Sequence, residues 1–156
     1  MKIAIGCDKL GLEFKKEFIK KLESGCHFIY DMGVMDGEDL DYPVIGAKVA
    51  EAVAYGRADR GILICGTGIG MCITANKTRG VYAAVCHDLY STQRSILSNN
   101  ANVMCIGALV VGKATALELL DVWMSLTFKD GPSTPKINKI KEIESHLKPE
   151  QMADFK

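Results

Sequence analysis

Residues 61–70 read Gly-Ile-Leu-Ile-Cys-Gly-Thr-Gly-Ile-Gly, a short apolar run that ends in a cysteine and passes into a glycine-rich loop. The composition of residues 71–77 is compatible with a helix, so the stretch predicts a strand, a loop and a helix start. Such a loop can direct several backbone N–H groups and the positive end of a helix dipole at one point. A thiol beside that point ionises more readily than an isolated cysteine. Cys65 is therefore a candidate nucleophile or base next to an anion hole.

The same alternation of apolar runs and helical patterns extends to both sides of this stretch. Strands are predicted at residues 2–6, 27–30, 61–65, 81–86 and 103–106, and helices at 10–24, 44–55, 70–77, 90–98, 113–128 and 136–147. This alternation implies crossover connections and a parallel sheet that is covered by helices on both faces. We predict one domain over residues 1–156 with a three-layer αβα, Rossmann-like fold. The common order 2-1-3-4-5 is expected for its five-stranded sheet.

The C-terminal part predicts an additional helix. Residues 129–135 contain two prolines and cannot continue the preceding helix. The following helix, 136–147, has a narrow apolar stripe on an otherwise charged surface, formed by Ile137, Ile140, Ile143 and Leu147. A narrow stripe predicts docking, either on the same domain or on a second subunit. Residues 148–156 are expected to be a frayed tail.

Composition excludes several classes of partner. Acidic and basic residues balance at 19 each, which gives no global attraction to nucleic acid or to a membrane. No run reaches the ~20 apolar residues that span a bilayer, and the N-terminal run leads straight into a strand, so no signal peptide is expected. The six cysteines include no Cys-x-x-Cys pair, which favours reduced thiols in a cytoplasm over disulfides. A soft-metal cluster would need paired spacing, so no metal is predicted.

The predicted sheet places a ligand site beside the glycine loop. Doubly wound sheets bind ligands outside the carboxyl ends of strands, where the strand order reverses. In the predicted order the reversal lies between the first and third strands, which are followed by residues 7–9 and 65–70. Asp8 and Lys9 should therefore lie next to the glycine loop, although charged residues after a strand can also form a simple solvated turn.

Each candidate has a structural alternative. Cys65 could be a small buried hydrophobe, as is expected for the other strand-end cysteines. A dinucleotide fingerprint would follow the first strand and have an acidic residue about 20 positions later, whereas here the loop follows the third strand and position 86 is a cysteine. The loop therefore suits an anionic oxygen or a phosphate better than a dinucleotide. His87 is either an acid or an exposed polar residue, and Asn99 could merely terminate a helix.

Six motifs occur together in one order along the chain. They are Ile3–Asp8, Asp41-Tyr42-Pro43, Ile64–Gly70, Ala75-Asn76-Lys77, Asn99–Val103 and Val110-Val111-Gly112. With them the chain resembles the ribose-5-phosphate isomerase B and galactose-6-phosphate isomerase subunit family over roughly residues 2–145.

The resemblance implies an aldose–ketose isomerase that uses no metal and no organic cofactor. Cys65 would move a proton between C1 and C2, and Thr67 with the backbone of the glycine loop would hold the enediolate oxygen. The loop positions carried over are Gly66, Gly68, Ile69 and Gly70, and the residues that would line the sugar are Asp8, Tyr42 and Asn99. Family members are dimers, often paired into tetramers, with the site at the dimer interface.

The chain departs from this pattern at positions that concern ring opening and phosphate binding. Lys9 and Ser98 stand where the family usually has histidines, and the second of these histidines opens the sugar ring. Leu109, Pro132 and Lys136 stand where arginines commonly grip the phosphate. Lys9 and Lys136 are predicted to replace part of that grip. His87 and Ser98 are the candidate acids for ring opening.

The predicted function is therefore a cytoplasmic, cofactor-independent isomerase of the ribose 5-phosphate/ribulose 5-phosphate type that works as a homodimer or homotetramer. Three alternatives remain open. The chain could be one subunit of a two-chain hexose-phosphate isomerase, a tetrose-phosphate isomerase, or a non-catalytic sugar-phosphate-binding protein.

Overall fold

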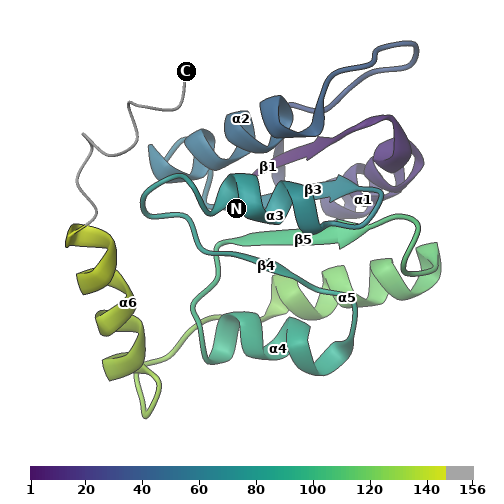
Figure 1. The fold of residues 1–156 in the computed structure, drawn as a ribbon. Helices are drawn as coiled ribbons and strands as arrows, with labels where there is room; N and C mark the ends of the chain where they lie inside the picture. Colours follow the sequence, from purple (N-terminus) through teal and green to yellow (C-terminus); the bar gives the residue numbers. More distant parts are fainter. Residues whose placement is uncertain (147–156) are drawn as a thin grey trace.

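The computed structural model describes residues 1–146 and shows a parallel sheet between two layers of helices (Figure 1). The strands are β1 (Lys2–Cys7), β2 (Phe28–Asp31), β3 (Arg60–Cys65), β4 (Ala83–Val85) and β5 (Val103–Gly107). All four strand pairings are parallel. The predicted αβα fold is therefore confirmed, while the predictions for Leu147 and for the tail 148–156 concern residues outside the described range.

The helices divide between the two faces of the sheet. They are η1 (Lys9–Gly11), α1 (Leu12–Ser24), α2 (Tyr42–Ala54), α3 (Ile69–Ala75), α4 (Leu89–Leu97), α5 (Lys113–Ser125) and α6 (Thr134–His146). Helices α2 and α3 pack together on one face, whereas α5 packs with α1 and α4 on the other (Figure 1). Between residues 1 and 146, no helix combines the length and the apolar character that crossing a bilayer requires.

The predicted strand order is wrong at one edge. The sheet has the order β2-β1-β3-β5-β4, so β5 and not β4 lies beside β3. All five residues of β5 are buried, whereas the three residues of β4 are only half-buried. The more apolar strand takes the interior position, and the short strand becomes the edge. The reversal between β1 and β3 is unaffected, so the expected ligand position is retained.

Helix α6 lies beyond the end of the sheet at which the strands begin (Figure 1). Glu144 holds it there, because its carboxylate accepts hydrogen bonds from Gly80 N at 2.8 Å and from the Tyr82 hydroxyl at 3.0 Å. Ile137 is buried, but Ile140 and Ile143 remain 44% and 60% exposed. The predicted apolar stripe is thus only partly covered by its own chain.

Candidate active site

Cys65 is the last residue of β3 and is buried below the glycine loop, with 5% exposure. The backbone N–H of Gly68 donates a hydrogen bond to its Sγ at 3.1 Å. Gly68 has a φ of +74°, a left-handed conformation that glycine adopts without strain. A side chain there would also place a Cβ only 3.0 Å from the carbonyl carbon of Ile106. Glycine at this position therefore allows the loop to fold back over the thiol.

The loop offers free hydrogen-bond donors beside this sulfur. Within residues 1–146, the backbone N–H groups of Gly66, Thr67 and Gly70 have no protein acceptor. The Thr67 hydroxyl accepts a hydrogen bond from Ile69 N at 3.3 Å, and both residues are exposed. Unpaired N–H groups that converge near a nucleophile or base can hold an oxyanion.

An open pocket of about 340 Å³ adjoins the loop at the carboxyl end of β1. It is lined by Asp8, Lys9, Leu10, Asp39, Leu40, Asp41 and Tyr42. Leu10 and Tyr42, at the rim of this pocket, touch the glycine loop. A Cβ on Gly66 would lie 3.0 Å from Leu10 Cδ1, and a Cβ on Gly70 would lie 2.6 Å from the Tyr42 ring. The structure thus brings Asp8, Lys9 and Tyr42 together with the loop of Cys65 and Thr67.

Asp8 and Lys9 are both engaged by neighbours in this pocket. The Asp8 carboxylate caps η1 by accepting hydrogen bonds from Leu10 N and Gly11 N, and partial burial raises the pKa of Asp8 despite these donors. Lys9 pairs with Asp39 at 2.8 Å, and its hydrogen bond to Asp39 raises the pKa of Lys9. Both partners are exposed, and an exposed ion pair is easily broken. A phosphate at Lys9 would therefore have to displace Asp39.

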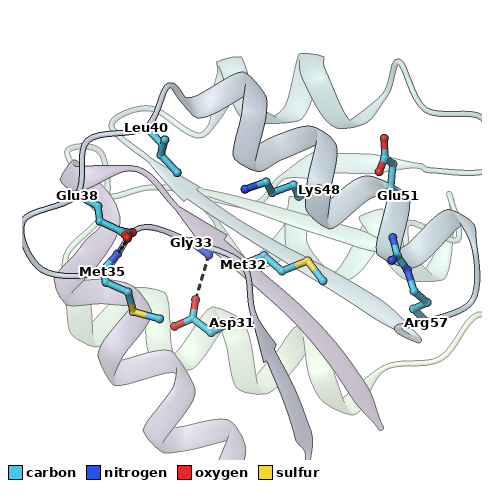
Figure 2. Close-up of a pocket in the computed structure, with 9 residues that line it drawn as sticks. All are labelled: Asp31, Met32, Gly33, Met35, Glu38, Leu40, Lys48, Glu51 and Arg57. Carbon is cyan, nitrogen blue, oxygen red and sulfur yellow. Dashed lines mark hydrogen bonds between the residues drawn. The ribbon is translucent and has the colours of Figure 1, made fainter.

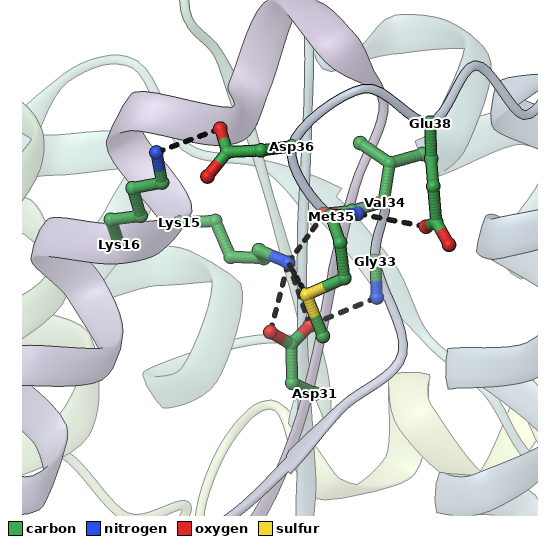
Figure 3. A network of polar contacts seen from close by, with 8 residues as sticks. All are labelled: Lys15, Lys16, Asp31, Gly33, Val34, Met35, Asp36 and Glu38. Carbon is green, nitrogen blue, oxygen red and sulfur yellow. Dashed lines mark hydrogen bonds and ion pairs between the residues drawn. The ribbon is translucent and has the colours of Figure 1, made fainter.

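The loop that carries Asp39 is anchored by a buried lysine. Lys15 is 2% exposed, and its Nζ lies 2.8 Å from Asp31 Oδ2 and 2.7 Å from the Val34 carbonyl oxygen (Figure 3). A buried ammonium group needs such partners, so this network fixes the start of the segment 32–41. Lys16 adds an exposed pair with Asp36 at 3.0 Å. The pocket wall at Asp39 is held by η1 and α1 in this way.

A larger hollow of about 550 Å³ lies on the other side of this segment, against α2 (Figure 2). Its lining is Asp31, Met32, Gly33, Met35, Glu38, Leu40, Lys48, Glu51 and Arg57. These side chains carry charges of both signs, and none of the predicted site residues is among them. The hollow is therefore separate from the glycine loop.

His87 lies at the same edge of the sheet as Cys65. Its Nε2 accepts a hydrogen bond from Gly107 N at 2.8 Å, and Gly107 is the β5 neighbour of Cys65. Burial lowers the pKa of His87, although Asp88 opposes this. The Gly107 N–H occupies the Nε2 lone pair, so this nitrogen carries no proton. In this arrangement His87 is an acceptor, which disfavours it as an acid.

Ser98, Asn99 and Lys136 do not join the glycine loop within one chain. Ser98 ends α4, and the Asn99 side-chain amide donates to the Arg94 carbonyl at 2.9 Å. Helix α4 runs back from the carboxyl end of β4, so its last residues lie where the strands begin, on the side that also holds α6 and its exposed Lys136 (Figure 1).

The structure adds residues that sequence reasoning missed. Asp39 and Leu40 line the pocket, yet residues 31–41 could be read only as an acidic, glycine-containing loop. Gly107 packs against Thr67. This contact follows from the pairing of β3 with β5, which the sequence did not predict. In the described part of the chain, no three His, Cys, Asp or Glu side chains are grouped to hold a metal ion.

Comparison with known proteins gives one consistent result. The model of the Ribose/Galactose Isomerase family matches residues 3–140. Ribose-5-P isomerase B of Listeria innocua serovar 6a is 48% identical over 144 residues, which cover 92% of this chain and 97% of that protein. D-erythrulose-4-phosphate isomerase of Pectobacterium atrosepticum is 43% identical, over 90% of this chain and 93% of that protein.

The fold agrees with that result. The structure of Clostridium thermocellum ribose-5-phosphate isomerase B matches with a TM-score of 0.89 and 43% identity, and the match covers 93% of this chain and 98% of that one. The chain therefore belongs to the Ribose/Galactose Isomerase family of sugar-phosphate isomerases.

Proposed function

We propose that this protein interconverts an aldose phosphate and a ketose phosphate without a cofactor, with Cys65 as the base. The observation that carries the proposal is the buried Cys65 sulfur beside the N–H groups of Gly66, Thr67 and Gly70, which have no acceptor within residues 1–146. Removal of a proton next to a carbonyl group builds negative charge on the carbonyl oxygen. Preorganised donors at that oxygen can lower the activation barrier by ~3–4 kcal/mol.

The reaction moves one proton between two adjacent carbons, and a second proton passes between the oxygens on those carbons. The Cys65 thiolate, which accepts the Gly68 N–H hydrogen bond, removes the proton from the carbon beside the carbonyl. The resulting enediolate oxygen is held by the Gly66 and Thr67 N–H groups and by the Thr67 hydroxyl. The thiol then returns the proton to the other carbon. Asp8 and Tyr42, which line the adjoining pocket, position the sugar hydroxyls.

A second copy of the chain completes the site in this proposal. Ser98, Asn99 and Lys136 lie at the end of the sheet where the strands begin, opposite the end that holds Cys65, so they can serve only another chain. The exposed Ile140 and Ile143 of α6 provide the apolar contact, and Lys136 then brings a positive charge to the substrate phosphate of the other subunit. The active form is a homodimer with two shared sites, or a tetramer built from such dimers.

Truncation of the chain after Pro135 tests this assembly. We expect loss of the dimer, measured by sedimentation. We also expect KM to rise by about tenfold or more, because one hydrogen bond to a charged group is lost. Because truncation also removes the buried Ile137, full-length Ile143→Glu is the second variant and should dissociate without unfolding. Lys136→Met should weaken substrate affinity yet remain dimeric. A fully active monomer in either assembly variant would exclude a shared site.

A tetrose 4-phosphate is the second candidate substrate. Isomerisation needs an open chain, and aldopentose 5-phosphates and hexose 6-phosphates are mostly closed rings. Ser98 has no useful acid–base group near neutrality, and the Nε2 of His87 is already occupied. The O4 of a tetrose 4-phosphate is esterified, so this sugar forms no furanose ring and needs no ring-opening acid. One relative of similar length is named a D-erythrulose-4-phosphate isomerase.

A screen of four-, five- and six-carbon sugar phosphates decides between the substrates. The tetrose assignment predicts that kcat/KM for a tetrulose 4-phosphate exceeds that for ribose 5-phosphate by at least about tenfold. His87→Gln, which keeps an acceptor for Gly107 N, should leave that activity nearly unchanged. If pentose or hexose phosphates react best and His87→Gln abolishes their turnover, His87 opens the ring and the tetrose assignment is wrong. Absence of turnover with every sugar phosphate would refute the proposed isomerase.

A further inference from the structure

Two segments that would serve a second chain share one anchor within their own chain. One is the segment 98–102 after α4, which carries Asn99, and the other is α6, which carries Lys136. Both segments make side-chain hydrogen bonds to residues 80–82, the stretch that leads into β4. This stretch lies at the end of the sheet where the strands begin, and it connects the two segments to each other (Figure 1).

Asn102 ties the first of these segments to residues 80–82. Its Oδ1 accepts a hydrogen bond from Tyr82 N at 2.8 Å, and its Nδ2 donates one to the Gly80 carbonyl oxygen at 2.8 Å. The backbone adds to this contact, because Asn102 N donates to the Tyr82 carbonyl oxygen at 3.0 Å. Val81, between the two anchored residues, is buried. The position of Asn99, three residues before Asn102, is therefore linked to residues 80–82.

Glu144 ties α6 to the same residues. Its Oε1 accepts a hydrogen bond from Gly80 N at 2.8 Å, and its Oε2 accepts one from the Tyr82 hydroxyl at 3.0 Å. Within residues 1–146, these are the only hydrogen bonds between α6 and any residue before position 130. The direction of α6 therefore depends on Glu144 together with the buried Ile137.

The contact between Tyr82 and Glu144 is suited to orient a helix. Both side chains are half-buried, and a hydrogen bond to a charged acceptor is stronger where water is partly excluded. Burial and the hydrogen bond to Glu144 raise the pKa of Tyr82 to about 12. The Tyr82 hydroxyl therefore keeps its proton near neutral pH and remains a donor to the carboxylate.

We propose that Asn102, Tyr82 and Glu144 are positioning residues that present Asn99 and Lys136 together to the second chain, a role that rests on the shared site of the proposed function. The three positioning residues lie where the strands begin, whereas Cys65 lies where β3 ends. They therefore act on the site of the other subunit and not on the Cys65 of their own chain. Loss of the Glu144 contact should weaken the dimer and raise KM, because α6 no longer holds Lys136 in place.

Tyr82→Phe and Glu144→Leu remove the contact in the full chain. Phenylalanine keeps the shape of tyrosine, so Tyr82→Phe should fold even if Glu144→Leu does not. For each variant we expect the dimer dissociation constant, measured by sedimentation, and the KM of the dimer to rise by about tenfold, because a hydrogen bond to a charged group is lost. Glu144→Gln should lie closer to the unsubstituted protein, since its amide can accept from Gly80 N and donate to the Tyr82 oxygen.

Glu142→Leu is the matched control for Glu144→Leu. It makes the same change of charge on α6, and within residues 1–146 the Glu142 carboxylate contacts only Lys139, on the same helix. Glu142 also lies about 200° around the helix from Ile140, at 100° per residue, and so points away from the proposed apolar contact. We expect Glu142→Leu to leave KM and the dimer dissociation constant unchanged.

Mixed dimers reveal the chain in which the defect acts. In a dimer of one Tyr82→Phe chain and one Cys65→Ser chain, the site that contains Cys65 receives α6 from the chain with an intact Tyr82. We therefore expect the mixture to gain a component with the KM of the unsubstituted protein.

Two results would overturn the proposal. One is a raised KM that persists in the mixed dimers, because the defect then acts within its own chain. The other is an unchanged dimer dissociation constant in both Tyr82→Phe and Glu144→Leu. Dimer dissociation is measured without substrate, so it tests the anchor of α6 even if Cys65→Ser stays fully active and the proposed function fails.

Discussion

Turnover should fall by about a hundredfold or more when Cys65 is replaced by serine, because a general base typically contributes that much. The hydroxyl of serine is not a base near neutral pH, whereas a thiolate can take and return the proton. The smaller oxygen still fits the site below the loop and can still accept the Gly68 N–H hydrogen bond. The fold should therefore survive, and the loss should appear in kcat.

The measurement compares initial rates on the best substrate of the sugar-phosphate screen, with circular dichroism and thermal melting as checks of folding. Cys7→Ser is the matched control, since Cys7 is also a buried cysteine at the end of a neighbouring strand. Burial raises the pKa of Cys7 to about 12, so this thiol stays protonated and cannot act as the base. Near wild-type turnover in Cys65→Ser, or an equal loss in Cys7→Ser, would refute the role of Cys65.

The location of the candidate site could be predicted because its signals are local. The apolar run 61–65 and the glycines after it specify a strand and a tight loop without reference to the rest of the chain. The reversal between β1 and β3 then follows from general rules of chain connection. For this reason the wrong order of β4 and β5 did not displace the site.

Long-range contacts could not be predicted in the same way. The strand order depends on how completely each strand is buried, and two apolar runs of similar length do not reveal that. The pair between Lys9 and Asp39 joins residues 30 positions apart in an irregular segment. The Asp39 carboxylate therefore competes with the substrate phosphate for Lys9, which the motif alone did not indicate.

Asn99 shows where motif and topology have to be combined. The resemblance puts this residue in the sugar site, yet any residue between a helix and the next strand of a parallel sheet lies where the strands begin. Cys65 lies where they end. Both statements hold together only if Asn99 serves a second chain, and Lys136 is at the same end of the sheet because α6 lies there. Topology is thus an independent argument for the proposed shared site.

The second large effect is expected for Gly107→Ala at the end of β5. A Cβ at this position would lie 2.7 Å from the carbonyl carbon of Thr67 and 2.8 Å from its oxygen. These are backbone atoms, which cannot rotate away as the end of a side chain can. The two segments are also tied by hydrogen bonds, from Ala108 N to the Cys65 carbonyl at 2.8 Å and from Leu109 N to the Gly66 carbonyl at 3.0 Å. The glycine loop must therefore move relative to Cys65.

A displacement of catalytic groups by about 1 Å can cost on the order of a hundredfold in rate, so we expect kcat of Gly107→Ala to fall by roughly that factor. Overpacking should also cost about 1–3 kcal/mol of stability.

Gly112→Ala is the matched control, because nothing lies within 4 Å of its Cβ position and Gly112 is the N-cap residue of α5. Gly112 makes no side-chain capping hydrogen bond and its φ of −69° suits alanine, so Gly112→Ala should change stability by no more than about 1 kcal/mol. If the two variants lose stability and turnover in the same proportion, the close packing of Gly107 against Thr67 has no special role. A large fall in kcat confined to Gly107→Ala would instead locate the reaction at the glycine loop beside Cys65.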